Sequence, residues 1–142
     1  MFMGTHQNQI DPKNRMIIPA KFRDELGYKC VLTFGIDSCL YIYKMEDWER
    51  FAEKIKELPL SDEDARTFIR HFFGNATECE IDRQGRITLP ADHRKYAGIE
   101  RELVTVGAMD KLEIWARERY GAAENSSMTP SEVARKMVQY GI

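Results

Sequence analysis

The fold is decided by the stretch Ile81–Ala91, which reads IDRQGRITLPA. Asp82 is followed three residues later by Gly85, and Arg86 comes directly after that glycine. Glycine adopts the positive φ of a tight turn at low steric cost, and the Ile-Thr-Leu run favours a strand. Because proline is favoured at the first position of a helix, the stretch predicts a turn, a short strand and a helix start.

The same pattern occurs earlier in the chain. The stretch Ile10–Ala20 reads IDPKNRMIIPA and matches position for position, with a spacing of 71 residues between Asp11 and Asp82. Asn14 stands where the later copy has Gly85, and asparagine tolerates the left-handed region better than other non-glycine residues. The chain therefore contains an internal repeat.

Each copy of the pattern is followed by the same predicted elements: a short helix, a glycine that ends it, and two strands joined by a turn. A strand is also expected over residues 2–10, before the first copy. In the first repeat the helix covers 20–26 and ends at Gly27, and the strands cover 30–34 and 40–43. In the second repeat the helix covers 91–97 and ends at Gly98, and strands at 103–106 and 112–115 flank a turn at 107–111.

Helices are predicted between and after the repeats. Apolar residues at helical spacing predict an amphipathic helix over 46–58, and Ser61 is expected to cap a second one. A short helical piece at 117–120, a linker at 121–128 and a last helix over 130–139 complete the chain. Thr129 begins a capping box for that last helix, which is too short to be stable alone and is expected to dock on the body or on a neighbouring subunit.

We therefore predict an α+β fold with a mainly-β core. The predicted divisions are a first repeat at 5–47, a helical insert at 48–75, a second repeat at 76–119, and a linker with a C-terminal helix at 120–142. The length of 142 residues suits one domain or two very small ones. With 43% hydrophobic and 31% charged residues, the chain can build a core.

The composition excludes several classes of protein. A formal charge of −2 excludes a binder that is basic overall, so any nucleic-acid contact must come from a local patch. Residues 12–23 provide such a bias, because they contain four basic residues and no acidic one. No signal peptide or membrane-spanning run is visible, and a cytoplasmic location is expected. The three cysteines, Cys30, Cys39 and Cys79, fit no metal-ligand spacing and are predicted to be reduced core thiols.

Two interpretations of the paired motif remain open. In the first, Asp11 and Asp82 only fix turns, and Arg15 and Arg86 only pair with those aspartates. In the second, the two arginines form a paired site for an anionic ligand, because a guanidinium suits phosphate oxygens and guanine edges. The candidate binding residues, including the nearby cations, are Arg15, Arg86, Lys13, Arg83, Lys21 and Arg23. The candidate turn-forming residues are Asp11, Asn14, Asp82 and Gly85.

Catalytic signals are weak. The three histidines, His6, His71 and His93, are not spaced as metal ligands, and no phosphate loop or nucleophile motif occurs. We predict no enzyme activity, no cofactor and no metal. A small enzyme that uses Asp82 and Arg86 is kept as an alternative, and it would require a deep pocket at those residues.

With both copies in view, the sequence resembles the MraZ family of bacterial transcription regulators. The segments that carry the resemblance are the N-terminal Met-Phe-Met-Gly, the two Asp-x-x-(Gly/Asn)-Arg turns, Pro19–Arg23, Ala76–Cys79 and Leu112–Trp115. The resemblance implies that each copy is an AbrB-like repeat, and that two copies in one chain form a swapped-hairpin, double-split β-barrel with pseudo-twofold symmetry. Asn14 departs from the usual glycine of the motif.

The resemblance also implies a function. Family members assemble into rings, bind short direct repeats in double-stranded DNA upstream of their own cell-division and cell-wall operon, and act mainly as repressors. The aspartate–arginine motif is associated with DNA contact, which implies that role for Arg15 and Arg86 and a nucleoid-associated location. A ring would compensate for the low charge of one subunit through avidity. The alternative is a ring-forming interaction scaffold that does not bind DNA.

Overall fold

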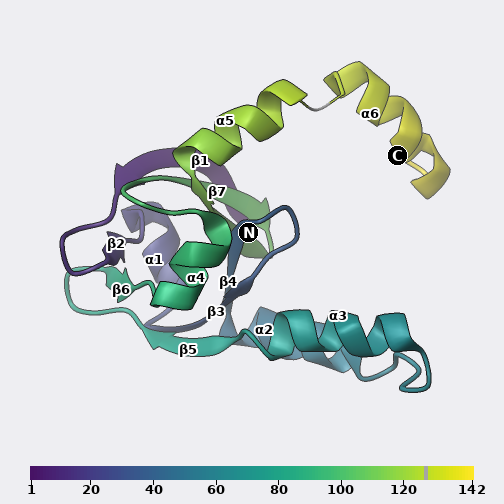
Figure 1. The fold of residues 1–142 in the computed structure, drawn as a ribbon, viewed down its shortest axis with the longest axis horizontal. Helices are drawn as coiled ribbons and strands as arrows, with labels where there is room; N and C mark the ends of the chain where they lie inside the picture. The colour runs from purple at the N-terminus through teal and green to yellow at the C-terminus, as the bar shows by residue number, and fades with distance from the viewer. Residues whose placement is uncertain (127) are drawn as a thin grey trace.

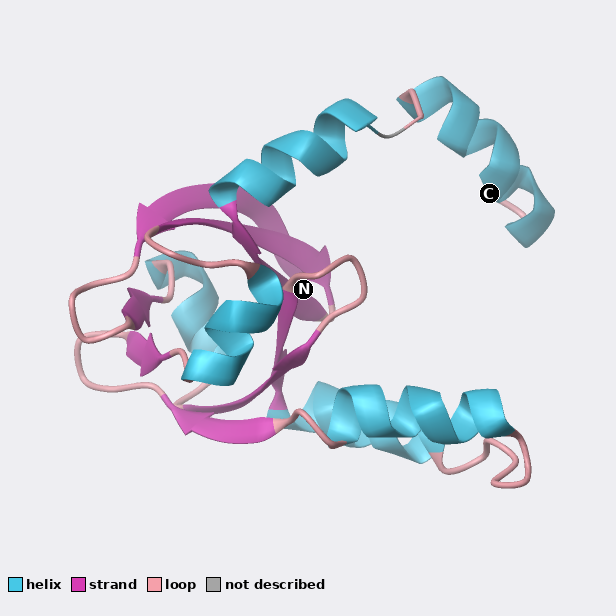
Figure 2. Cartoon of the chain, viewed as in Figure 1, coloured by secondary structure: helices cyan, strands magenta, loops and turns pink. Residues whose placement is uncertain are grey.

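The computed structural model describes residues 1–126 and 128–142. Its elements alternate short strands and helices along the chain (Figures 1 and 2). The strands are β1 (Phe2–Gln9), β2 (Arg15–Ile17), β3 (Lys29–Phe34), β4 (Leu40–Lys44), β5 (Thr77–Glu80), β6 (Arg86–Thr88), β7 (Glu102–Met109) and β8 (Lys111–Ala116). The helices are α1 (Ala20–Leu26), α2 (Met45–Ile55), α3 (Glu63–Phe73), α4 (Ala91–Ala97), α5 (Arg117–Ser126) and α6 (Pro130–Met137), followed by a 3₁₀ turn at Val138–Tyr140. The predicted α+β fold with a mainly-β core is confirmed.

Strand pairing interlocks the two repeats. The larger sheet has the order β1-β7-β8-β4-β3-β5, and β2 pairs with β6 in a separate two-stranded sheet. The first strand of each repeat pairs with the third strand of the other, as β1 with β7 and β5 with β3. Two further pairs, β4 with β8 and β2 with β6, also join the repeats. Each repeat therefore depends on the other for most of its strand pairing.

The register of these pairs gives the molecule a pseudo-twofold axis. In the two-stranded sheet Met16 lies opposite Ile87, and these residues occupy equivalent positions in the two repeats. In the larger sheet Tyr41 lies opposite Glu113, which are equivalent residues as well. In each of these two pairs, one strand is thus related to the other by a twofold rotation about an axis through the middle of the pair.

The main core is aliphatic and fills the space between the curved larger sheet, the β2–β6 pair, α1 and α4 (Figure 1). Both repeats contribute equivalent residues to it. Its completely buried members include Met16, Ile18, Leu32, Leu40, Ile42, Ile87, Leu89, Leu103, Leu112 and Ile114. Burial of each such side chain contributes about 1.5–3 kcal/mol of transfer free energy, so this core holds the interlocked strands together.

An aromatic cluster attaches the α2–α3 pair to the other face of the sheet. Tyr41 and Tyr43 point from β4 toward Phe51 and Phe72, and their rings pack against those side chains. Only 7% and 3% of the two tyrosines are exposed. Both tyrosines are therefore core residues. The pair α2–α3 extends from the sheet as an arm (Figure 2).

Two helix boundaries differ from the sequence prediction. The first amphipathic helix ends at Ile55 and not at Leu58. The cap of α3 is Asp62 and not Ser61, because an oxygen of the Asp62 carboxylate accepts a hydrogen bond from the amide of Asp64 at 2.9 Å. A carboxylate at this position also interacts favourably with the helix dipole, which explains the displacement by one residue.

The strand prediction was too short in the second repeat. We expected a turn at 107–111, but β7 continues to Met109. The reason is tertiary: β1 pairs with β7 along its whole length, from Gln9 opposite Glu102 to Phe2 opposite Met109. The backbone groups that the sequence pattern assigned to a turn are therefore satisfied by a strand from the other repeat.

The predicted linker at 121–128 is mostly helical. The helix α5 runs through Gly121 to Ser126, because Tyr120 and Ala123 pack against the aromatic cluster around Trp115. The linker prediction was therefore wrong for 121–126, and Ser127 lies outside the described residues.

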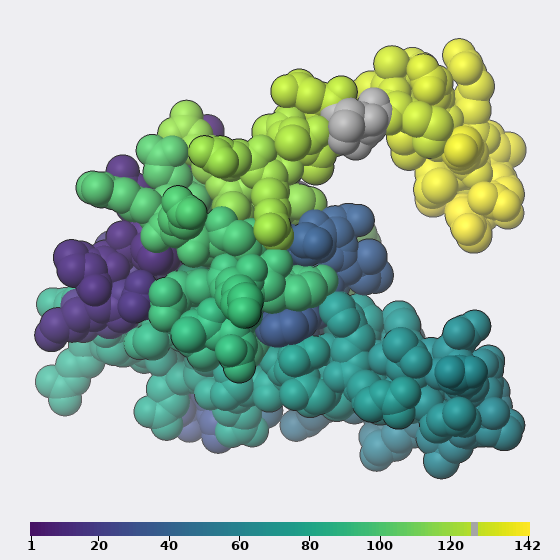
Figure 3. Space-filling model, in the orientation of Figure 1, coloured from purple at the N-terminus to yellow at the C-terminus, as the bar shows by residue number. Residues whose placement is uncertain are grey.

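The last helix is capped as predicted but does not dock on the body. The hydroxyl of Thr129 accepts a hydrogen bond from the amide of Glu132 at 3.2 Å. None of the residues of α6 is buried, and in Figure 3 its yellow residues stand apart from the body of the molecule. Docking on a neighbouring subunit stays a prediction. In the described part of the chain, no helix is long and apolar enough to cross a membrane.

Candidate nucleic-acid interface

The first turn is organised by the carboxylate of Asp11. One oxygen, Oδ1, accepts hydrogen bonds from the amides of Lys13 and Arg15, both at 2.9 Å. The other, Oδ2, accepts a hydrogen bond from Nε of Arg15 at 2.7 Å. The backbone closes the loop, since the amide of Asn14 donates to the carbonyl of Asp11. Asn14 has a φ of 61°, in the left-handed region.

The second turn repeats this arrangement. Oδ1 of Asp82 accepts from the amides of Gln84 and Arg86, at 2.9 and 2.8 Å. Oδ2 accepts from Nε of Arg86 at 2.8 Å, and Gly85 has a φ of 79°. In both turns the aspartate therefore fixes the turn and pairs with its arginine. These are the contacts that the first of our two interpretations requires.

These contacts leave most of each guanidinium available. Within residues 1–126 and 128–142, the Arg15 and Arg86 side chains make their hydrogen bonds only through Nε. The Nη donors remain for a ligand, and the two side chains are 27% and 25% exposed. An arginine held at Nε presents its Nη groups in a fixed direction, which favours recognition of a phosphate or a guanine edge.

The carboxylates are stabilised in their charged form. The Arg15 amide that donates to Asp11 is the main cause of a pKa below the ordinary value for that carboxyl, assisted by the Arg15 side chain. The Arg86 amide lowers the pKa of Asp82 in the same way. Both ion pairs therefore persist at neutral pH.

The β2–β6 pair places the two arginines on one exposed face. Alternate residues of a strand point to opposite sides, so Met16 and Ile87 enter the core while Arg15 and Arg86 face outward. Ile17 pairs with Arg86 and shares this outward face, where 48% of it is exposed. Thr88 occupies the equivalent place beside Arg15. Sequence analysis missed both neighbours, although their alternation with the buried residues was a usable signal.

The other candidate cations lie in three different settings. Lys13 and Arg83 are exposed in the turns themselves. Arg23 lies behind the second turn, where its Nε donates to the carbonyl of Ile18 at 2.8 Å. Lys21 lies beside Gly4 in β1 and not beside either turn. The structure therefore brings Lys13, Arg83 and Arg23 to the turns with Arg15 and Arg86, and leaves Lys21 outside this group.

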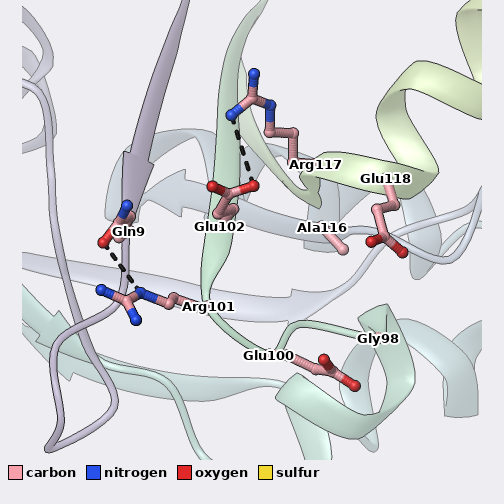
Figure 4. A pocket seen from close by; sticks show the side chains of 8 residues that line it. All are labelled: Gln9, Gly98, Glu100, Arg101, Glu102, Ala116, Arg117 and Glu118. Atoms are coloured by element: carbon pink, nitrogen blue, oxygen red, sulfur yellow. Dashed lines mark hydrogen bonds and ion pairs between the residues drawn. The ribbon is translucent and has the colours of Figure 1, made fainter.

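The recesses near the turns do not resemble an active site. A recess of about 340 Å³ beside the second turn is lined by Asp82 and Arg83 but not by Arg86. This recess thus does not bring together the two residues that the enzyme alternative requires. A cavity of about 420 Å³ lies at the base of α5 (Figure 4). Two cations there are already engaged, Arg101 with Gln9 at 3.2 Å and Arg117 with Glu102 at 3.5 Å.

Two of the histidines, and the cysteines, have structural settings. Ring nitrogens of His71 and His93 lie 2.8 Å from the carbonyls of Gly35 and Asn75. All three cysteines are free, and burial raises the pKa of the Cys30 and Cys39 thiols to about 12. In the described ranges, no group of three or more potential ligands is placed to hold a metal ion.

Comparison with known proteins identifies the family. The family model for the MraZ protein matches the chain twice, over residues 1–71 and 72–140. Relatives in Moorella thermoacetica, Clostridium tetani and Clostridium beijerinckii are 48%, 46% and 45% identical to it. Each of these alignments covers 100% of both chains, and each relative is named Transcriptional regulator MraZ, a name that describes a regulator and not an enzyme. The chain, with its two interlocked repeats, belongs to the MraZ family.

Proposed function

We propose that this protein is a sequence-specific DNA-binding transcriptional regulator, and that Arg15 and Arg86 contact the DNA. The observation that carries the proposal is the common outward face of β2 and β6, on which two guanidinium groups held at Nε flank a pseudo-twofold axis. A two-stranded ribbon fits the major groove, and arginine Nη groups pair with guanine O6 and N7. The names of the relatives point to the same function.

The distribution of charge supports this orientation. Lys13 and Arg83 extend from the two turns into solvent, where they would meet phosphates on either side of the ribbon. The acidic residues of 46–66 lie on the α2–α3 arm, which projects away from the β2–β6 end of the molecule (Figure 1). A protein of net charge −2 thereby keeps this cluster of acidic residues away from DNA.

The pairing of strands between repeats supports two finer structural proposals. The first is that the β-elements and the short helices α1 and α4 form a swapped-hairpin, double-split barrel of the AbrB type. The second is the division of the chain at 5–47, 48–75, 76–119 and 120–142. The reciprocal β1–β7 and β5–β3 pairs, which exchange one strand in each direction, support the first. The position of α2 and α3 in the chain, between β4 and β5, supports the second.

Self-assembly into a ring is supported by the surface of the C-terminal segment. Val138, Tyr140 and Ile142 are exposed by 65%, 69% and 87%, and they follow a helix that buries none of its residues. Exposed apolar side chains gathered in this way mark interaction sites. Docking on another copy would bury them, and repeated subunits would engage repeated DNA sites.

Our biological proposal follows the family resemblance. The protein acts as a repressor that binds short direct repeats upstream of its own cell-division and cell-wall operon, in the cytoplasm and in association with the nucleoid. The competing candidate is a ring-forming scaffold that does not bind DNA, and the exposed C-terminal segment is the feature that favours it.

The test is fluorescence anisotropy with duplexes carrying one or several copies of the upstream repeat. Arg15→Ala with Arg86→Ala should weaken binding strongly and leave the assembly size unchanged in light scattering. The matched control is Lys54→Ala with Lys56→Ala, which removes the same charge from exposed positions on the arm. A wild-type protein that assembles but binds no duplex would support the scaffold, and equal affinity for one and several repeats would contradict the ring-avidity proposal.

A further inference from the structure

Arg23 and Arg94 occupy equivalent positions on α1 and α4, 71 residues apart. Nε of Arg23 donates to the carbonyl of Ile18 at 2.8 Å, and Nε of Arg94 donates to the carbonyl of Leu89 at 3.0 Å. Both arginines are half-buried, so these hydrogen bonds are partly protected from water. Each bond fixes the residue that precedes the proline of its own repeat.

From these residues the hydrogen bonds continue into the other repeat. The amide of Ile18 donates to the carbonyl of Gly85 at 2.8 Å, and the amide of Gly85 donates to the carbonyl of Asp82 at 2.9 Å. Asp82 in turn holds Nε of Arg86. A continuous series of bonds therefore leads from Arg23 in the first repeat to Arg86 in the second.

The mirror series has the same form. The amide of Leu89 donates to the carbonyl of Asn14 at 2.9 Å, and the amide of Asn14 donates to the carbonyl of Asp11 at 2.9 Å. Asp11 holds Nε of Arg15. Arg94, in the second repeat, is thus connected to the turn of the first repeat.

A direct contact strengthens the first series. The guanidinium of Arg23 lies so close to the second turn that a Cβ placed on Gly85 would be 2.3 Å from Arg23 Cζ. Hydrogen bonds in series polarise one another, and a packed side chain excludes water that would compete for the turn's carbonyls. Loss of Arg23 should therefore loosen the turn that carries Arg86 and spare the turn that carries Arg15.

We propose that Arg23 and Arg94 are positioning residues that act across the pseudo-twofold axis, Arg23 on Arg86 and Arg94 on Arg15. The inference rests on the proposed DNA-binding function and adds to it a coupling between repeats. Each repeat supplies the arginine that meets DNA and also supports the arginine of the other repeat.

The experiment is a pair of double-mutant cycles on DNA affinity with the full-length chain. Arg23→Ala should weaken binding by about three- to tenfold in the wild-type background and by a similar factor with Arg15→Ala. With Arg86→Ala already present, Arg23→Ala should have little further effect. Arg94→Ala should show the opposite pattern, coupled to Arg15 and independent of Arg86. A general loss of stability would weaken binding equally in every background, so equal factors overturn the inference.

A second variant separates positioning from direct contact with phosphate. Arg23→Lys keeps the positive charge but lacks the Nε donor and the planar group that covers Gly85. Affinity close to that of Arg23→Ala supports the inference, and wild-type affinity contradicts it. If Arg15→Ala with Arg86→Ala binds DNA as well as wild type, the proposed function fails. If that pair loses binding but the cycles show no crosswise pattern, only the positioning inference fails.

Discussion

The first turn, residues 11–15, and the second turn, residues 82–86, make the same hydrogen bonds around different residues. In each, an aspartate accepts hydrogen bonds from two backbone amides and from one guanidinium Nε, at 2.7–2.9 Å. The left-handed position holds Asn14 in one and Gly85 in the other, with φ of 61° and 79°. The turn conformation therefore depends on the aspartate and on a residue that accepts positive φ, and not on glycine itself.

What separates the two positions is their surroundings. Gly85 is buried, and the guanidinium of Arg23 occupies the space where a Cβ would lie. Asn14 is half-buried and keeps its side chain. The local conformation thus restricts both positions to residues that accept positive φ, and at the second turn a neighbour distant in sequence, Arg23, further restricts the choice to glycine.

The largest expected effect tests whether the two turns contribute equally to DNA binding. Because each arginine is held in the same way, Arg15→Ala and Arg86→Ala should each weaken DNA affinity by about tenfold, and the double variant by about a hundredfold. Anisotropy titrations at one fixed salt concentration measure these constants. Single variants that differ by more than about tenfold would show that the two turns are not equivalent in the complex.

The second-largest effect is expected on the free energy of unfolding, at the two turn positions with positive φ, Asn14 and Gly85. Gly85→Asn should lower the free energy of unfolding by about 1–2 kcal/mol, because the new Cβ displaces Arg23 and breaks its hydrogen bond to Ile18. Asn14→Gly should change it by less than about 0.5 kcal/mol, since glycine accepts the same φ. Urea denaturation of both variants provides the comparison. A change of equal size at the two positions would contradict the role that we assign to Arg23.

A smaller effect is expected for the exposed cations of the turns. Lys13→Ala and Arg83→Ala should each weaken DNA binding by a factor of about two to five and reduce the salt dependence by about one counterion. The two residues lie in different turns, so their effects should add independently. Titrations over a range of salt concentrations measure the slope, and an unchanged slope would place either residue away from phosphate.

The smallest effect appears only in acid. Because the pKa values of Asp11 and Asp82 are lowered in the folded protein, their stabilisation is complete above the pKa of the unfolded chain, near 4. It is lost as the pH falls through the lower folded values. Wild type should therefore lose thermal stability below pH 4 more steeply than Asp11→Asn with Asp82→Asn. The measurement is the melting temperature of both proteins from pH 2.5 to 6. If the two melting temperatures change with pH in parallel, these carboxyls contribute nothing to the pH dependence of stability.

Much of the local structure could be predicted from the sequence. The helices that end at Gly27 and Gly98 match their predicted ranges, since caps and breakers act within a few residues. Predictions failed where the deciding contact was remote. Gly107 suggested a turn but lies opposite Gly4 in a strand pair, and Gly121 suggested a linker but lies in a helix whose neighbouring side chains pack on the sheet.

The sequence by itself determined the repeat, the two aspartate–arginine turns and the pair of arginines that we propose meets DNA. These depend on spacing and on hydrogen bonds within five residues, which any copy of the motif can form. Only the tertiary structure decided that each repeat lends a strand to the other, that Ile17 and Thr88 lie beside the arginines, and that Arg23 packs on Gly85. Those features depend on the register between strands more than forty residues apart, which is fixed by burial of the shared core.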